Sequence, residues 1–203
     1  MGWFKRIISK IVPSKKPVLI EGKPSGKIQK IALLVGHGAG DSGAIGWNKV
    51  EEHSYNSKVA TLLNSQDLGK EIKVFYKSKS GGWATTYLEV AKFAPDLSIE
   101  LHLNAANGKA YGCEVLVLNG QESTAEIGRN FALSFTKKFS RRMRGDQGIK
   151  WISSGDRGYG NLVGASVVAT WSILVEPFFI DTESEWIDVS EYAKFFAEWI
   201  KGL

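Results

Sequence analysis

The chain has 203 residues, of which 43% are hydrophobic and 23% are charged, as is typical of one globular domain with its own core. Its single cysteine, Cys113, excludes an intramolecular disulfide and any metal site built from several cysteines. The net charge of +5 comes from residues 1–30, where basic residues far outnumber the single acidic one, so we expect no nucleic acid to bind the slightly acidic remainder.

The first predicted element is a helix over residues 1–12, MGWFKRIISKIV. Its apolar residues recur at helical spacing, with basic residues beside them. The segment is too short to span a bilayer, which takes about 20 apolar residues, and no signal peptide is evident, because charges interrupt its apolar run. Two interpretations remain open. The helix lies on an anionic membrane surface, or it docks on the domain or frays.

Residues 13–30 are rich in proline, glycine, serine and lysine, a composition that predicts a linker. The chain therefore divides into a basic amphipathic segment with its linker, residues 1–30, and one domain over residues 31–203.

Strands and helices alternate through the domain. Apolar runs predict strands over residues 31–38, 70–78, 97–106, 112–120 and 171–180. Helical spacing predicts helices over residues 50–66, 82–94, 123–139 and 183–203. This alternation predicts an α/β fold, a single layered domain with a mostly parallel twisted sheet flanked by helices. In such folds, binding and catalytic sites form where the carboxyl ends of the strands meet the loops.

Chemically capable side chains stand at those strand ends. His37 follows the first strand in a glycine-rich turn, His102 lies near the end of the third strand, and Glu176 interrupts an apolar strand. A buried carboxylate is costly unless it is paired or binds a metal. Two histidines and one carboxylate make a zinc site that leaves a position for water, and a further carboxylate can move the proton of that water. Asn104, two residues after His102, could orient a substrate.

Each of these residues also has an ordinary structural explanation. A single histidine is more often part of the core or the surface than a metal ligand. Glu51 and Glu52 open a predicted helix, where carboxylates commonly compensate the helix dipole. Spacing alone does not decide between these two glutamates as the carboxylate ligand.

Four motifs in order give a more specific indication: GHGAGDSGAIG, EEHSYN, ELHLNAA and ILVEPFFIDTESEW. This series resembles the zinc-dependent N-acetylmuramoyl-L-alanine amidases of the amidase_3 type, which cut the amide between N-acetylmuramic acid and L-alanine in peptidoglycan. The resemblance spans about residues 31–203. It implies one zinc ion on His37, Glu52 and His102, with Glu52 chosen because Asn56 follows it by four positions. It also implies that Glu176 is the general base and acid.

Three departures from the family pattern bear on substrate preference. Leu34 and Val35 stand where Asp-Pro is usual, and Glu100 stands where serine commonly precedes the second histidine. The glycine that usually follows the late glutamate is replaced by Pro177. None of these changes removes a predicted ligand or the predicted base.

The resemblance predicts an enzyme whose partner is peptidoglycan. Two alternatives remain: a zinc peptidase that cuts within the stem peptide, and a non-catalytic peptidoglycan-binding domain of the same fold. The chain also resembles a compact phage or prophage endolysin. We therefore expect a protein that stays in the cytoplasm until it is released to the cell wall. Whether residues 1–12 associate with the membrane depends on which of the two interpretations of that segment holds.

Overall fold

The computed structural model of the chain describes residues 27–38 and 40–203. The helix predicted over residues 1–12 and most of the predicted linker lie outside these residues. No helix in the described part of the chain combines the length and the apolar character that crossing a membrane requires.

The centre of the fold is a six-stranded sheet with the order β2-β1-β3-β6-β4-β5. β1, β2, β3 and β6 run parallel, whereas β4 pairs antiparallel with β6, and β5 runs parallel to β4. The predicted α/β fold with a mostly parallel sheet is confirmed. The strands are β1 (Lys30–Val35), β2 (Glu71–Tyr76), β3 (Leu97–Leu101), β4 (Glu114–Leu118), β5 (Ile149–Ile152) and β6 (Trp171–Glu176).

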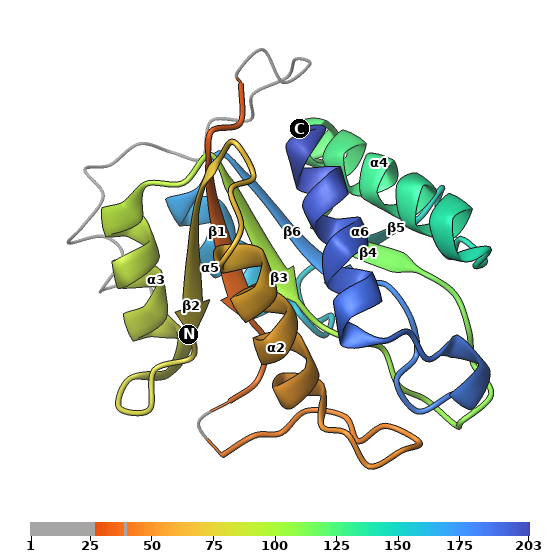
Figure 1. Cartoon of the computed structure of the whole chain (residues 1–203). Helices are drawn as coiled ribbons and strands as arrows, with labels where there is room; N and C mark the ends of the chain where they lie inside the picture. Colours follow the sequence, from red (N-terminus) through yellow and green to blue (C-terminus); the bar gives the residue numbers. More distant parts are fainter. Residues whose placement is uncertain (1–26, 39) are drawn as a thin grey trace.

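Helices cover both faces of this sheet (Figure 1). The helices are α2 (Glu52–Asn64), α3 (Gly82–Phe93), α4 (Glu122–Phe139), α5 (Tyr159–Val168) and α6 (Val189–Lys201), with a short 3-10 helix, η1 (Glu183–Glu185). α2, α4 and α6 pack on one face, and α3 and α5 pack on the other. Because strand residues alternate between faces, Leu33 of β1 contributes to the first layer and Leu34 to the second. Burial on both faces explains why the strands read as continuous apolar runs.

Three local features differ from the sequence-based prediction. The helix predicted over residues 183–203 is interrupted, because Asp188 caps a new helix by accepting a hydrogen bond from the Ser190 N–H at 2.8 Å. β5 was not predicted, since its sequence IKWI is only four residues long and a lysine interrupts its apolar residues. α5 was also missed, because YGNLVGASVV is rich in glycine and valine, which have low helix propensity.

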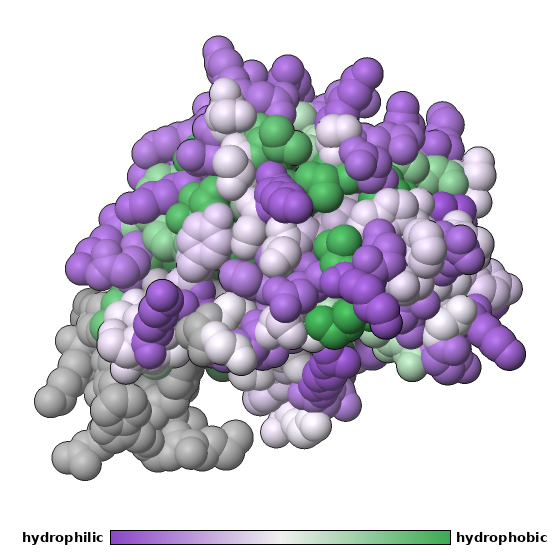
Figure 2. Space-filling view, turned by 60° about the horizontal axis from the view of Figure 1, so that its bottom comes forward, coloured by the Kyte–Doolittle hydropathy of each residue, from purple (hydrophilic) through white to green (hydrophobic). Residues whose placement is uncertain are grey.

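The parallel strands end at the lower edge of the molecule in Figure 1, where the loops after β1, β3 and β6 meet. Figure 2 turns this lower side forward and shows a mostly hydrophilic surface on which hydrophobic residues are scattered. The chemistry-bearing residues predicted from the sequence lie at this edge.

Candidate metal centre and active site

His37 stands in the loop that follows β1, with a backbone φ of 63°. A positive φ is uncommon for a residue other than glycine, and such residues often occur at functional sites. The imidazole is held on both sides. Nδ1 lies 3.0 Å from Asp41 Oδ2, and Nε2 lies 3.1 Å from Glu52 Oε2.

Glu52 is the first residue of α2 and is fully buried. Its carboxylate accepts backbone hydrogen bonds from the N–H groups of Ala44 and Leu103, each at 2.9 Å. Glu51, one residue earlier, is exposed and accepts instead from the Ser54 hydroxyl at 3.2 Å. Of the two glutamates left open by the spacing, the structure therefore brings Glu52 to the histidines.

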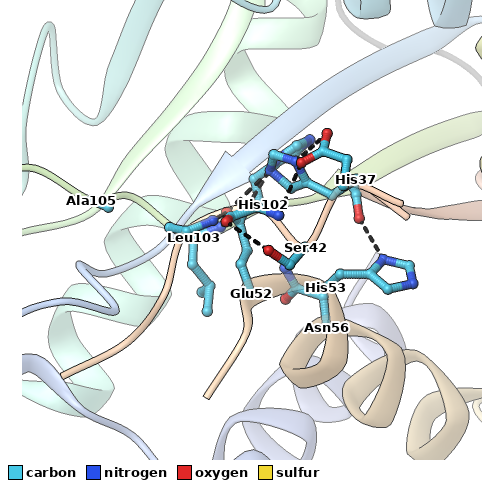
Figure 3. Close-up of polar contacts among 12 residues, drawn as sticks. His37, Ser42, Glu52, His53, Asn56, His102, Leu103 and Ala105 are labelled. Carbon is cyan, nitrogen blue, oxygen red and sulfur yellow. Dashed lines mark hydrogen bonds and ion pairs between the residues drawn. The ribbon is translucent and has the colours of Figure 1, made fainter. Parts of the chain in front are cut away.

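His102 follows the end of β3 and completes the cluster (Figure 3). Its Nδ1 lies 3.0 Å from Glu52 Oε1, and its Nε2 lies 2.9 Å from Glu100 Oε1. The rings of His37 and His102 meet edge to face, with centroids 4.9 Å apart. One ligand atom from each of His37, Glu52 and His102 lies within 4.8 Å of the others.

This cluster fits a divalent metal ion. Within the described residues, the buried His37 Nε2 makes no hydrogen bond, although Glu52 Oε2 lies 3.1 Å from it. Two imidazoles and one carboxylate are a ligand set that zinc favours, and they leave a fourth position for water or substrate.

The three groups also perturb one another's ionisation strongly. Burial would raise the pKa of Glu52, but the adjacent imidazoles of His102 and His37 outweigh burial and hold that pKa well below its usual value. Burial would lower the pKa of His102, yet the carboxylates of Glu100 and Glu52 raise it to about 10. Without a metal, the negative Glu52 carboxylate and the protonated His102 imidazole therefore stabilise each other's charge. A metal ion that binds there would displace the proton from the imidazole.

Glu176 ends β6 and lines the same cavity as His37 and His102, a space of about 320 Å³. Burial and then the neighbouring Glu114 carboxylate raise the pKa of Glu176 to about 7. Glu114 stands opposite Glu176 in the antiparallel β4–β6 pair. The Arg144 guanidinium, 3.1 Å away, holds the pKa of Glu114 below its usual value against the opposing effect of burial.

Asn104, the predicted substrate-orienting residue, contacts a carboxylate beside Glu176. Its side-chain amide donates to Glu114 Oε1 at 2.7 Å, so within the structure it contacts the neighbour of Glu176. His53, the residue after Glu52, points away from the cluster, and its Nδ1 lies 2.8 Å from the Gly36 carbonyl oxygen (Figure 3).

Several residues around the cavity were not found by sequence reasoning. Glu114 carried the same signal as Glu176, a carboxylate within an apolar strand, and could have been found by it. The others carried no such signal, because three of them come from loops or from the unpredicted α5, and Trp83 is one aromatic residue within the predicted helix α3. They are Lys77, Trp83, Arg157 and Asn161.

Comparisons with known proteins agree with this geometry. The family model described as N-acetylmuramoyl-L-alanine amidase (Amidase_3) matches residues 31–201. No curated protein sequence matches the chain. Among solved structures, the catalytic domain of the CD27L endolysin targeting Clostridia difficile is 25% identical, with a TM-score of 0.65 over 86% of this chain and 97% of that one.

Two further solved structures share the fold at lower identity. The apo form of the N-acetylmuramyl-L-alanine amidase Ami1 from Mycobacterium abscessus is 16% identical, with a TM-score of 0.67 over 86% of this chain and 97% of that one. The N-acetylmuramoyl-L-alanine amidase from Clostridium difficile 630 is 21% identical, with a TM-score of 0.61 over 87% of this chain and 95% of that one.

Proposed function

The chain belongs to the N-acetylmuramoyl-L-alanine amidase family, and we propose that it performs this family's reaction with one zinc ion held by His37, Glu52 and His102. Family membership makes it an amidase that hydrolyses an amide bond in peptidoglycan. The observation that carries the zinc proposal is the convergence of three ligand atoms within 4.8 Å at the edge of a cavity that Glu176 also lines.

Zinc, when bound, would lower the pKa of a water molecule to about 7 and polarise the amide carbonyl. Glu176 is the residue that moves the proton. Its carboxylate takes a proton from the attacking water and returns it to the leaving nitrogen of L-alanine. A pKa of about 7 suits both steps, because the group exchanges a proton readily near neutral pH.

The remaining cavity residues suit a substrate that joins sugar and peptide. Trp83 offers an aromatic face against which a sugar ring can pack, and Lys77 and Arg157 offer positive charges to carboxylates of the peptide. These side chains lie beside His37 and His102, so they would hold the substrate where the amide meets the cluster.

Residues 1–12 carry a separate part of the proposal. Their apolar stripe and basic residues would hold the enzyme on an anionic membrane surface, close to its polymeric substrate. Co-sedimentation of the full chain with anionic vesicles, and not with neutral ones, is the expected result. Equal binding to both, or to neither, would contradict it.

The catalytic proposal is tested with purified peptidoglycan, digested by the wild type and by Glu176→Gln, with the metal content of both proteins measured. We expect the wild type to hold zinc and to release intact stem peptides with free L-alanine amino groups. We expect Glu176→Gln to hold zinc and to release nothing. Products cut within the stem peptide would favour a zinc peptidase, and zinc-independent binding without products would favour a binding domain.

A further inference from the structure

β3 carries a buried carboxylate that the proposed reaction does not use. Glu100 is only 1% exposed. Its partners in the neighbouring strands are Leu34 of β1 and Leu174 of β6, both buried and apolar. A carboxylate in such surroundings costs free energy unless hydrogen-bond donors satisfy it. The donors that Glu100 has therefore indicate why it is there.

Two side chains donate to the same oxygen of Glu100. His102 Nε2 lies 2.9 Å from Oε1, and Asn161 Nδ2 lies 2.6 Å from it. The first contact follows from the strand, since residues two apart share a face. The other ring nitrogen of His102, Nδ1, is turned toward Glu52 at 3.0 Å. The imidazole is thus held between two carboxylates, one at each nitrogen.

His37 is held in the same manner. Its Nδ1 is bound by Asp41 at 3.0 Å, and its Nε2 is turned toward Glu52 at 3.1 Å. In both histidines, the nitrogen that faces Glu52 is the one placed to meet a metal, and the opposite nitrogen is tied to a second carboxylate. Metal-bound histidines usually donate their other N–H to a carboxylate or carbonyl, which fixes the ring and makes it a better ligand.

We propose that Glu100 is a positioning residue for the metal centre, which keeps the proton of neutral His102 on Nε2 and so presents Nδ1 to the zinc ion. This inference rests on the proposed function, because it assumes a metal on His37, Glu52 and His102. The amidase motif commonly has serine at this position, so the carboxylate is a feature of this chain.

Asn161 connects the Glu100–His102 pair to the cavity wall. It lies on α5, lines the cavity, and donates to the oxygen that His102 also uses. The Asn161 amide therefore holds Oε1 in place for the histidine. Through Glu100, the cavity wall is connected to a metal ligand.

Zinc affinity of the full chain, measured by competition with a chromogenic chelator, tests the inference. Glu100→Ala removes both the acceptor and the charge, whereas Glu100→Gln keeps an acceptor oxygen. Glu185→Gln is the matched control, because Glu185 is also buried but binds the Gly112 N–H and Arg141 and contacts none of the three ligands. Circular dichroism of each chelator-treated protein checks the fold.

We expect Glu100→Ala to weaken zinc affinity by about 10–100-fold, since removal of such an outer carboxylate typically has that effect. Glu100→Gln should weaken it less, and Glu185→Gln should leave it unchanged. Zinc binding by Glu100→Ala as tight as that of the wild type would overturn the inference. If Glu100→Ala does not fold, Glu100→Gln decides: affinity below that of Glu185→Gln supports the inference, and equal affinity overturns it.

A second readout reports the ring nitrogen directly. In protein loaded with an NMR-active cadmium isotope and labelled histidine, we expect metal coupling to Nδ1 of His102 in the wild type and in Glu100→Gln. Coupling to Nε2 in the wild type would overturn the inference while the proposed function stands. A wild type that binds neither zinc nor cadmium would overturn both.

Discussion

Gly43 offers a quantitative test of how closely the loop after β1 fits the metal ligands. Its φ is +71°, and a Cβ added there would lie 2.5 Å from His37 Cδ2 and 2.7 Å from Glu52 Oε2. Gly40, in the same loop, has a φ of +94°, and no atom of the described residues lies within 4 Å of such a Cβ. Gly43→Ala and Gly40→Ala therefore share backbone strain, but only Gly43→Ala intrudes on the ligands.

The expected effects separate cleanly. A left-handed alanine costs about 1–2 kcal/mol, so both variants should lose a few degrees of Tm, at about 2–4 °C per kcal/mol for a domain of this size. Gly43→Ala must also push the ligands apart until ordinary contact at 3.4 Å is reached, a shift of nearly 1 Å for His37. Metal–ligand distances vary by only about 0.2 Å between sites, and misplacing a functional group by about 1 Å can cost about 100-fold in its effect. Zinc affinity should therefore fall at least about 100-fold.

Neither ligand can move away easily. His37 is tied to Asp41, and Glu52 accepts from the N–H groups of Ala44 and Leu103. The assay is zinc affinity by chelator competition, with Tm measured on chelator-treated protein. Equal zinc affinity in Gly43→Ala and Gly40→Ala would refute the reasoning, because strain alone would then explain both variants.

Three further outcomes are expected. Glu114→Gln removes the carboxylate whose charge, together with burial, raises the pKa of Glu176, so the acid limb of the pH profile of kcat/KM should move to lower pH. An acid limb that stays in place or moves to higher pH would show that Glu114 does not act on Glu176. Zinc binding near pH 8 should release protons, because the pKa of His102 is about 10 and the imidazole must lose its proton to bind the metal. Calorimetry in buffers of different ionisation enthalpy measures the number of protons released, and a value of zero would contradict the prediction. Phe131→Ala should lower the free energy of unfolding by about 3–5 kcal/mol in urea titrations, since Phe131 is fully buried among the aromatic rings of α4 and α6; a loss below about 1 kcal/mol would mean that the core closes around the gap.

The identity of the amidase motifs could be predicted from the sequence because each is local. His37 and His102 stand directly after apolar runs, and Glu176 is a charge inside one. Strand residues alternate in direction and strand ends meet loops, so short-range patterns placed these side chains at one edge of the sheet. The fold class followed from the same patterns, because alternating strands and helices permit few architectures.

Pairings between distant segments were decided only by the tertiary structure. Glu51 and Glu52 look alike in sequence, and the start of α2 turns only Glu52 toward the histidines. Glu114 meets Glu176 because β4 runs antiparallel to β6, a direction that neither strand encodes alone. These two pairings depend on how whole helices and strands pack against one another. The free energy that fixes such packing is spread over the core, so a short stretch of sequence does not predict the pairings.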